Sequence, residues 1–350
     1  MNRTGKHGPD SAAGIDPRDA AGAFGAAPYN AESFGQIRVI DTWRKYADDL
    51  AWGKGQCLAI LDDGCDLSDP VWQTELAWGK KVIAAYNSID GNDDPAPVPP
   101  GYHGTSVGYP SSQNHAGIHG IAYNNFVAQV RCVTIVHLKG QGEAPTIAAA
   151  LQWVLDHHER HNITAVNLSP LDDERHREPV ATPIDQKPMA LRERGIWVSA
   201  PCGNHNYTDG ISWPACQPHC FAIGATVPGK HEAYLDRFSN TDLLVAAQAT
   251  SSSNAFAAAC AMILREAVEK LKYPWQRDGA NLPGALMAIF RQTGGIIELR
   301  ATGIDANLAD TASGHAINDY LYLPGDDLAA LQRNGPVKIT VRERGPLVTS

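Results

Sequence analysis

The chain has 350 residues, of which 43% are apolar and 19% charged, so it can form one large or two ordinary globular domains and is not disordered overall. Its formal net charge of −9 disfavours a nucleic-acid-binding protein, because such proteins usually present a basic face. No apolar run is long enough to span a bilayer, so no membrane partner is expected.

The ends of the chain differ in composition from its middle. Residues 1–26 are rich in Gly, Ala, Asp and Pro and are predicted to form a flexible arm. Residues 27–325 are predicted to form the folded domain, with 326–350 as a C-terminal extension. The first residues lack the apolar core of a secretory signal, which predicts a cytoplasmic protein, or a secreted one if an export signal lies outside this sequence.

The seven cysteines favour a reducing compartment. An odd number leaves at least one without a partner in the chain. Cys57, Cys132 and Cys260 stand in apolar runs and are predicted to be buried thiols. Cys216 and Cys220 are close enough to form a small disulfide loop and are equally able to stay free.

The first half of the chain alternates short apolar runs with one long helical pattern. "CLAILDDG" (57–64) predicts a buried strand that ends in acids and glycine, and "FVAQVRCVTIV" (126–136) predicts two strand segments. Helical spacing begins after Pro145 and ends near Asn162. "ITAVNLSP" (163–170) predicts the next strand.

The same alternation continues to about residue 293. A helix at 189–194 ends before Gly195, and strands are predicted at 196–204, 220–226 and 243–248. Two more helices are predicted at 252–272 and 283–293. Strands alternating with helices of this size predict an α/β fold, with a mostly parallel central sheet between two layers of helices.

Polar residues at the ends of these strands are the candidates for function, because active groups in parallel sheets gather at the carboxyl ends of the strands. A serine nucleophile needs a nearby base, and that base needs an acid to orient it. Asp62 ends a strand, His103 opens "HGTSVG" after the Pro-rich loop 88–102, and Ser251 precedes the long helix. Singly, these residues fit a turn, a loop histidine and a helix cap, but their joint occurrence in this order favours catalysis.

Four segments carry a resemblance to the subtilisin-like serine proteases, the subtilase family. "LAILDDGCDLSDP", "HGTSVG", "VSAPCGN" and "ATSSSNAFAAA" are similar to the motifs that hold the family's catalytic Asp, catalytic His, oxyanion Asn and nucleophilic Ser. The resemblance implies that residues 27–325 form a subtilisin-like catalytic domain of a serine endopeptidase. It implies these roles: Asp62 as orienting acid, His103 as general base, Ser251 (not Ser252 or Ser253) as nucleophile, and Asn204 as oxyanion donor.

The resemblance also implies how a peptide or protein substrate binds. Gly140, Gly142 and Ser169 correspond to strands that pair with the substrate backbone by β-augmentation. Gly203 belongs to the wall of the main specificity pocket. "GHAIN" (314–318) resembles the glycine-rich turn that closes the fold.

Two departures from the family motifs suggest alternative functions. Ala249 replaces a glycine before the serine, and Pro170 replaces a small residue after Ser169 and removes a backbone donor. The unusual residues Pro201 and Cys202 beside Gly203, together with the lack of a visible secretory signal, suggest a narrow-specificity maturation protease or a transpeptidase. The altered serine motif alternatively suggests a homologue that binds peptides without cutting them.

No cofactor is required by this chemistry. "SQNHAGI" (112–118) resembles the family's calcium loop, in which Asn114 matches one ligand, but Val71 stands where a companion acid is expected, which disfavours calcium. His157 and His161 have a zinc-compatible spacing but lack a third ligand, which favours a solvated helix face. The acids of "LDDERHRE" (171–178) are also expected to be solvated. Structural thiols are favoured over a metal site for the set Cys202, Cys216, His219 and Cys220.

Overall fold

A computed structural model describes residues 26–230, 232–298 and 313–316 of the chain. Apart from Ala26, the predicted N-terminal arm lies outside the described residues, and so do the predicted C-terminal extension and residues 317–325.

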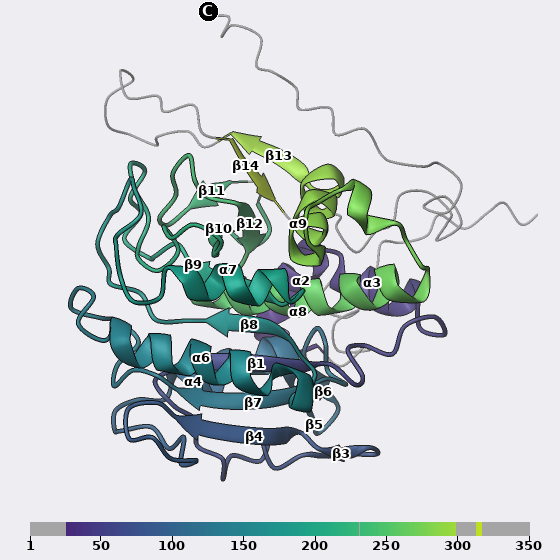
Figure 1. Ribbon diagram of the computed structural model, residues 1–350. Coiled ribbons are helices and arrows are strands. Elements are labelled where there is room, and N and C mark those ends of the chain that lie inside the picture. The colour runs from purple at the N-terminus through teal and green to yellow at the C-terminus, as the bar shows by residue number, and fades with distance from the viewer. Residues whose placement is uncertain (1–25, 231, 299–312, 317–350) are drawn as a thin grey trace, which may run out of the picture.

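A ten-stranded, mostly parallel sheet forms the centre of the molecule (Figure 1). Its spatial order is β13-β14-β12-β10-β9-β8-β1-β7-β4, with β11 paired to β10 outside this path. Pairing is parallel except between β10 and β11 and between β13 and β14. The strands are β1 (Cys57–Asp62), β4 (Val82–Asn87), β7 (Phe126–Arg131), β8 (Ile163–Leu168), β9 (Trp197–Pro201), β10 (Phe221–Thr226), β11 (Ala233–Tyr234), β12 (Leu243–Ala246), β13 (Gly295–Glu298) and β14 (Ser313–Ala316).

Helices and short hairpins surround this sheet. The helices are η1 (Pro28–Asn30), α2 (Ala31–Gln36), α3 (Val39–Lys45), α4 (His103–Val107), α5 (Tyr109–Ser112), α6 (Ala144–His161), α7 (Gln186–Glu193), α8 (Thr250–Lys270), η2 (Trp275–Arg277) and α9 (Leu282–Thr293). Two antiparallel pairs, β2 (Glu75–Leu76) with β3 (Gly79–Lys80) and β5 (Asn114–His115) with β6 (Ile118–His119), lie outside the main sheet.

Alternation of side chains along β1 creates the three layers. Leu58 and Ile60 pack into the core cluster that contains α8, whereas Ala59 and Leu61 pack into the cluster that contains α6. Successive side chains of a strand point to opposite faces, so a strand buried on both faces is apolar throughout, as "CLAIL" is. The predicted three-layer αβα architecture is therefore confirmed.

Several element boundaries differ from the prediction. Only Phe126–Arg131 of the segment 126–136 is a strand, because the next two amides turn to the carbonyl of Asp62 and the chain leaves the sheet. Strand β4 is absent from the prediction although "VIAAY" (82–86) is an apolar run; it is an edge strand that is only partly buried. The segment expected to form a closing turn lies in β14 up to Ala316, and residues 317–318 are outside the described part.

All seven cysteines are free and buried. Cys216 and Cys220 are therefore unbridged, which decides between the two alternatives left by the sequence. Burial raises the pKa of the Cys216 thiol to about 12, so this thiol stays protonated at neutral pH. None of the helices described is long and apolar enough to cross a lipid bilayer.

Asn254 joins helix α8 to the sheet, and its loss is expected to destabilise the protein. Its side-chain amide is fully buried and donates to Asn167 Oδ1 at 2.7 Å and to the carbonyl oxygens of Leu168 and Ser199, both at 3.2 Å. Because Asn254→Ala leaves buried acceptors without a donor, we expect it to lower the free energy of unfolding in urea by about 1–3 kcal/mol.

Glu269→Ala is the matched control for this measurement, because Glu269 lies near the other end of the same helix and is exposed beside Arg265. We expect it to change the free energy of unfolding by less than about 0.5 kcal/mol. Equal effects of the two substitutions would show that the buried amide does not hold α8 in place.

Candidate active site

The predicted site residues gather where the parallel strands end. Asp62 is the last residue of β1, Ser169 follows β8 directly, and Asn204 comes three residues after β9. His103 is the first residue of α4, and Ser251 is the second residue of α8, which follows β12. This edge is where a parallel α/β sheet commonly holds its functional groups.

Asp62 and His103 form a hydrogen-bonded pair. The Nδ1 atom of His103 lies 2.9 Å from each carboxylate oxygen of Asp62. Burial alone would raise the pKa of Asp62, but the charge and hydrogen bond of His103 hold it below its ordinary value. Burial disfavours a charged imidazole, yet the Asp62 carboxylate raises the pKa of His103 above its ordinary value. An ionised Asp62 favours the proton on Nδ1, which leaves Nε2 available as a base.

Gly104 allows helix α4 to approach the end of β1. A Cβ atom at this position would lie 2.3 Å from the carbonyl oxygen of Gly64 and 2.7 Å from Cβ of Asp62. Any larger residue would therefore push His103 away from the Asp62 carboxylate. The glycine of "HGTSVG" is thus explained by a close backbone approach.

Asp63 is a positioning residue that the sequence analysis did not assign. Its Oδ1 accepts the amide of Gly104 at 2.8 Å, and its Oδ2 accepts the amide of His103 at 3.4 Å. Desolvation and the adjacent Asp62 charge raise the pKa of Asp63 to about 6. The second acid in "DDG" was the available signal, because a carboxylate suits the free amides at a helix start.

Ser169, predicted to contact substrate, lies against the Asp62 carboxylate. Its hydrogen bond to that carboxylate helps to lower the pKa of Asp62. The Ser169 hydroxyl accepts a hydrogen bond from Asn167 Nδ2 at 2.8 Å, and Asn167 in turn accepts one from Asn254. A buried polar network therefore links the acid on β1 to helix α8, and Ser169 orients Asp62 within it.

Asn204 and Ser251 are brought together through Thr250. Asn204 Oδ1 accepts the backbone amide of Thr250 at 2.9 Å and its hydroxyl at 3.0 Å. The oxygen end of the Asn204 carboxamide is thereby engaged, and its Nδ2 end is the remaining donor. The backbone amide of Ser251 lies in the first turn of α8 and therefore has no acceptor within the helix.

The Ser251 hydroxyl is not hydrogen-bonded to His103 among the described residues, although α4 and α8 are in contact. Ser251 is nearly buried, at 8% exposure. Ser253 has a different role, since its hydroxyl donates to the carbonyl oxygen of Val245 at 3.0 Å. Hydrogen bonds of catalytic groups are often long before substrate binds, so this arrangement still suits a nucleophile and its base.

The prediction that Gly140 and Gly142 lie on a strand is wrong. Both belong to the turn that precedes α6, and Gly140 has a φ of +68°, which ends an extended path. Instead, Leu138 donates its amide to Leu171 at 2.8 Å, and Leu171 donates its amide to Val136 at 3.0 Å. The two segments expected to hold a peptide between them are thus paired with each other here.

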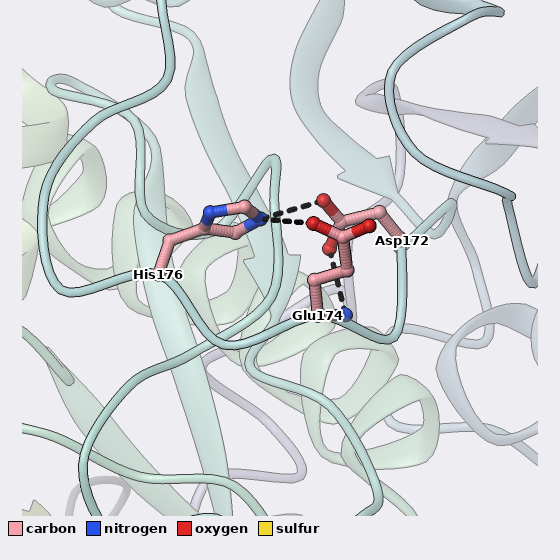
Figure 2. A group of neighbouring side chains, drawn as sticks. All are labelled: Asp172, Glu174 and His176. Atoms are coloured by element: carbon pink, nitrogen blue, oxygen red, sulfur yellow. Dashed lines mark hydrogen bonds and ion pairs between the residues drawn. The ribbon is translucent and has the colours of Figure 1, made fainter.

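Asp172, Glu174 and His176 form a compact cluster beside these segments (Figure 2). His176 Nε2 lies 2.7 Å from Asp172 Oδ2 and 3.9 Å from Glu174 Oε2. Asp172 also accepts the amides of Trp213 at 3.0 Å and Glu174 at 3.2 Å and the side-chain amide of Gln141. Asp172 is buried, so the expectation of solvated acids is wrong for this residue. Protein donors already engage both carboxylate oxygens of Asp172, so the cluster is explained as a hydrogen-bonded structural network.

The His157–His161 pair considered from the sequence is not part of a metal-ligand cluster of His, Cys, Asp and Glu in the described residues. The Asp172 cluster meets metal-ligand spacing there, and the set around Cys202 does not. His157 stacks on Trp153 with ring centroids 4.6 Å apart, and His161 lies 6.2 Å further along. Asn114 donates its side-chain amide to Asn124 Oδ1 at 3.2 Å.

Comparison with known proteins gives matches over the same region. Residues 53–251 match the family model described as the subtilase family. The chain is 27% identical over 234 residues to a subtilisin-like protease of Coccidioides posadasii, covering 65% of this chain and 52% of that protein. It is 23% identical over 205 residues to subtilisin-like protease 1 of Arthroderma gypseum, covering 56% and 38%. The chain thus spans about half or less of the length of these relatives.

Solved structures share the fold at low sequence identity. A cold-adapted subtilisin-like serine proteinase is 15% identical with a TM-score of 0.53, covering 76% of this chain and 89% of that chain. A structure of MycP1 with its N-terminal propeptide removed is 12% identical with a TM-score of 0.58, covering 85% and 98%. The fold of this chain is therefore subtilisin-like.

Proposed function

The chain belongs to the subtilase family, and we propose that it is a serine endopeptidase that cleaves peptide bonds through an acyl-enzyme on Ser251. The observation that carries this proposal is the Asp62–His103 pair, with both Nδ1–oxygen distances at 2.9 Å, at the same sheet edge at which α8 begins. This pair has the geometry of a base held by its orienting acid.

In the proposed reaction His103 carries the protons, and the other groups stabilise the charges that form. His103 Nε2 takes the hydroxyl proton as Ser251 Oγ attacks the peptide carbonyl carbon, and Asp62 stabilises the imidazolium that forms. The Ser251 amide and Asn204 Nδ2 donate to the developing oxyanion. His103 then gives its proton to the leaving amine, and water hydrolyses the acyl-enzyme with the same base.

A specific observation favours the narrower alternative of a maturation protease or transpeptidase. The bridge between His137 and Leu171 closes the two segments on each other, so an extended peptide cannot add between them without parting them. The proposed site would therefore favour substrates that form few backbone contacts with these two segments. We propose that a peptide or protein of restricted sequence is the partner.

The proposed chemistry needs no cofactor, because the hydroxyl, imidazole and carboxylate supply every proton transfer. We propose that calcium is not bound at the 112–118 loop, since Asn114 pairs with Asn124 and Val71 supplies no carboxylate. Seven free thiols support a reducing, cytoplasmic location for the protein.

Labelling with a fluorophosphonate probe tests the proposed function. The probe reacts with activated serines, so we expect one adduct on Ser251, located by mass spectrometry, and its loss in His103→Ala. His158→Ala, on helix α6, is the matched histidine control and should label normally. Well-folded wild-type protein that takes no label would instead support the peptide-binding alternative.

A further inference from the structure

Two carboxylates and an imidazole form a cluster directly after Asn204. His205 Nδ1 lies 3.5 Å from Asp173 Oδ1 and 4.0 Å from Asp236 Oδ2. Asp173 lies in the loop after β8, and Asp236 lies two residues after β11. Residues far apart in the sequence therefore place two acidic groups next to the proposed oxyanion donor.

Each of these carboxylates keeps one buried oxygen without a hydrogen-bond donor in the described structure. These oxygens are Asp173 Oδ1 and Asp236 Oδ2. The other oxygens are engaged, since Asp236 Oδ1 accepts the amide of Tyr207 at 2.8 Å and Asp173 Oδ2 lies 2.7 Å from His137 Nδ1. Buried carboxylate oxygens normally have donors, because burying them unpaired is costly. His205 is therefore the nearest cationic group to these two oxygens, but it forms no hydrogen bond with either of them.

The neighbouring charged side chains do not supply a hydrogen-bond donor to these two oxygens. Desolvation raises the pKa of fully buried Asp236 to about 6, although nearby amides and His205 act against the rise. Arg175 and Arg177 are paired with Asp209, at 3.2 and 2.8 Å. Buried Arg237 favours the Asp236 charge, but its Nη1 donates to Asn206 and to the carbonyl of Leu235.

The cluster adjoins the backbone that leads into the proposed oxyanion donor. A Cβ atom on Gly203 would stand 2.1 Å from Asp236 Oδ2, so this carboxylate touches the backbone immediately before Asn204. Suppose that the carbonyl of the scissile bond accepts hydrogen bonds from Asn204 and the Ser251 amide. The side chain of the substrate residue before that bond then begins close to the backbone of Gly203. A long cationic side chain that begins there would meet the two oxygens only by displacing His205, because Asp236 is fully buried in the free protein.

We propose that this cluster takes the side chain of an arginine or lysine that immediately precedes the scissile bond, with Asp173 and Asp236 as the specificity-determining residues. The inference rests on the proposed peptidase function. His205 covers the acids in the free protein and is 43% exposed at its side chain, so its imidazole can move aside when a basic side chain enters. The charge-assisted hydrogen bonds formed would satisfy both buried oxygens.

Four peptides that differ only in the residue before the scissile bond test this inference. With arginine, lysine, citrulline or leucine at that position, we expect kcat/KM for arginine to exceed that for citrulline by about 100-fold, because citrulline keeps the shape of arginine without its charge. Asp173→Asn should reduce this ratio by about tenfold or more. Asparagine suits the positive φ of Asp173, +56°, so the variant should fold.

Asp156→Asn is the matched control, because Asp156 is an exposed acid on helix α6 that does not belong to the cluster; it should leave the ratio unchanged. Fluorophosphonate labelling of Ser251, which needs no particular side chain, is measured in parallel. Labelled protein that cleaves the arginine and citrulline peptides equally, or prefers leucine, overturns this inference and leaves the peptidase proposal standing. Protein that neither labels nor cleaves any of the four overturns both.

Discussion

Ser251→Ala is expected to reduce kcat/KM for any cleaved peptide by about 10⁶-fold, as losing the nucleophile of a serine peptidase does. The substitution removes the only atom proposed to form the acyl-enzyme, and the oxyanion donors alone retain little of the rate. Because the Ser251 hydroxyl has no hydrogen bond in the described structure, the free energy of unfolding should change by less than about 1 kcal/mol. Peptide cleavage and urea denaturation measure the two effects separately.

The neighbouring serine gives a matched control in the same helical turn. Ser252 is partly exposed on α8, and Ser252→Ala should keep kcat/KM within a few-fold of wild type. A large loss in Ser252→Ala with normal activity in Ser251→Ala would move the nucleophile by one residue. Normal activity in both variants would exclude the proposed serine chemistry at this helix.

The main elements around the site could be predicted because short-range signals specify them. The apolar run of β1 followed by "DDG" indicates a buried strand ending in acids, and the structure places Asp62 at that end. His103 opens a helix, as its position before Gly-Thr suggests. Asn204 depends on a neighbour in space, Thr250, yet its place after β9 already put it at the correct sheet edge.

Contacts between distant segments could not be predicted. Nothing in "VNLSP" indicates that Ser169 bonds to Asp62, since β8 and β1 become neighbours only when the sheet forms. The burial of Asp172 likewise depends on the segment that contains Trp213, which supplies an amide from 41 residues away. The turn at Gly140 follows from a positive φ that a glycine permits but does not require.

Asp62→Asn is expected to lower kcat by about 10⁴-fold, because an amide can stabilise the wrong tautomer of the His103 imidazole. The fold is expected to stay intact. In wild type, burial disfavours the charged imidazole, but the Asp62 carboxylate raises the pKa of His103 above its ordinary value. Since only neutral His103 can accept the serine proton, kcat/KM should rise with pH through that raised pKa.

The variant should move this acidic limb of the pH profile in a definite direction. Without the carboxylate charge, burial is the dominant influence on His103 and lowers its pKa, so the residual activity should reach its plateau at a lower pH than in wild type. Asp66→Asn is the matched control: Asp66 is exposed in the loop after β1, and its loss should leave the limb in place. If the acidic limb stays at the same pH in Asp62→Asn, Asp62 does not govern the protonation of His103. The roles proposed for the three triad residues would then be wrong.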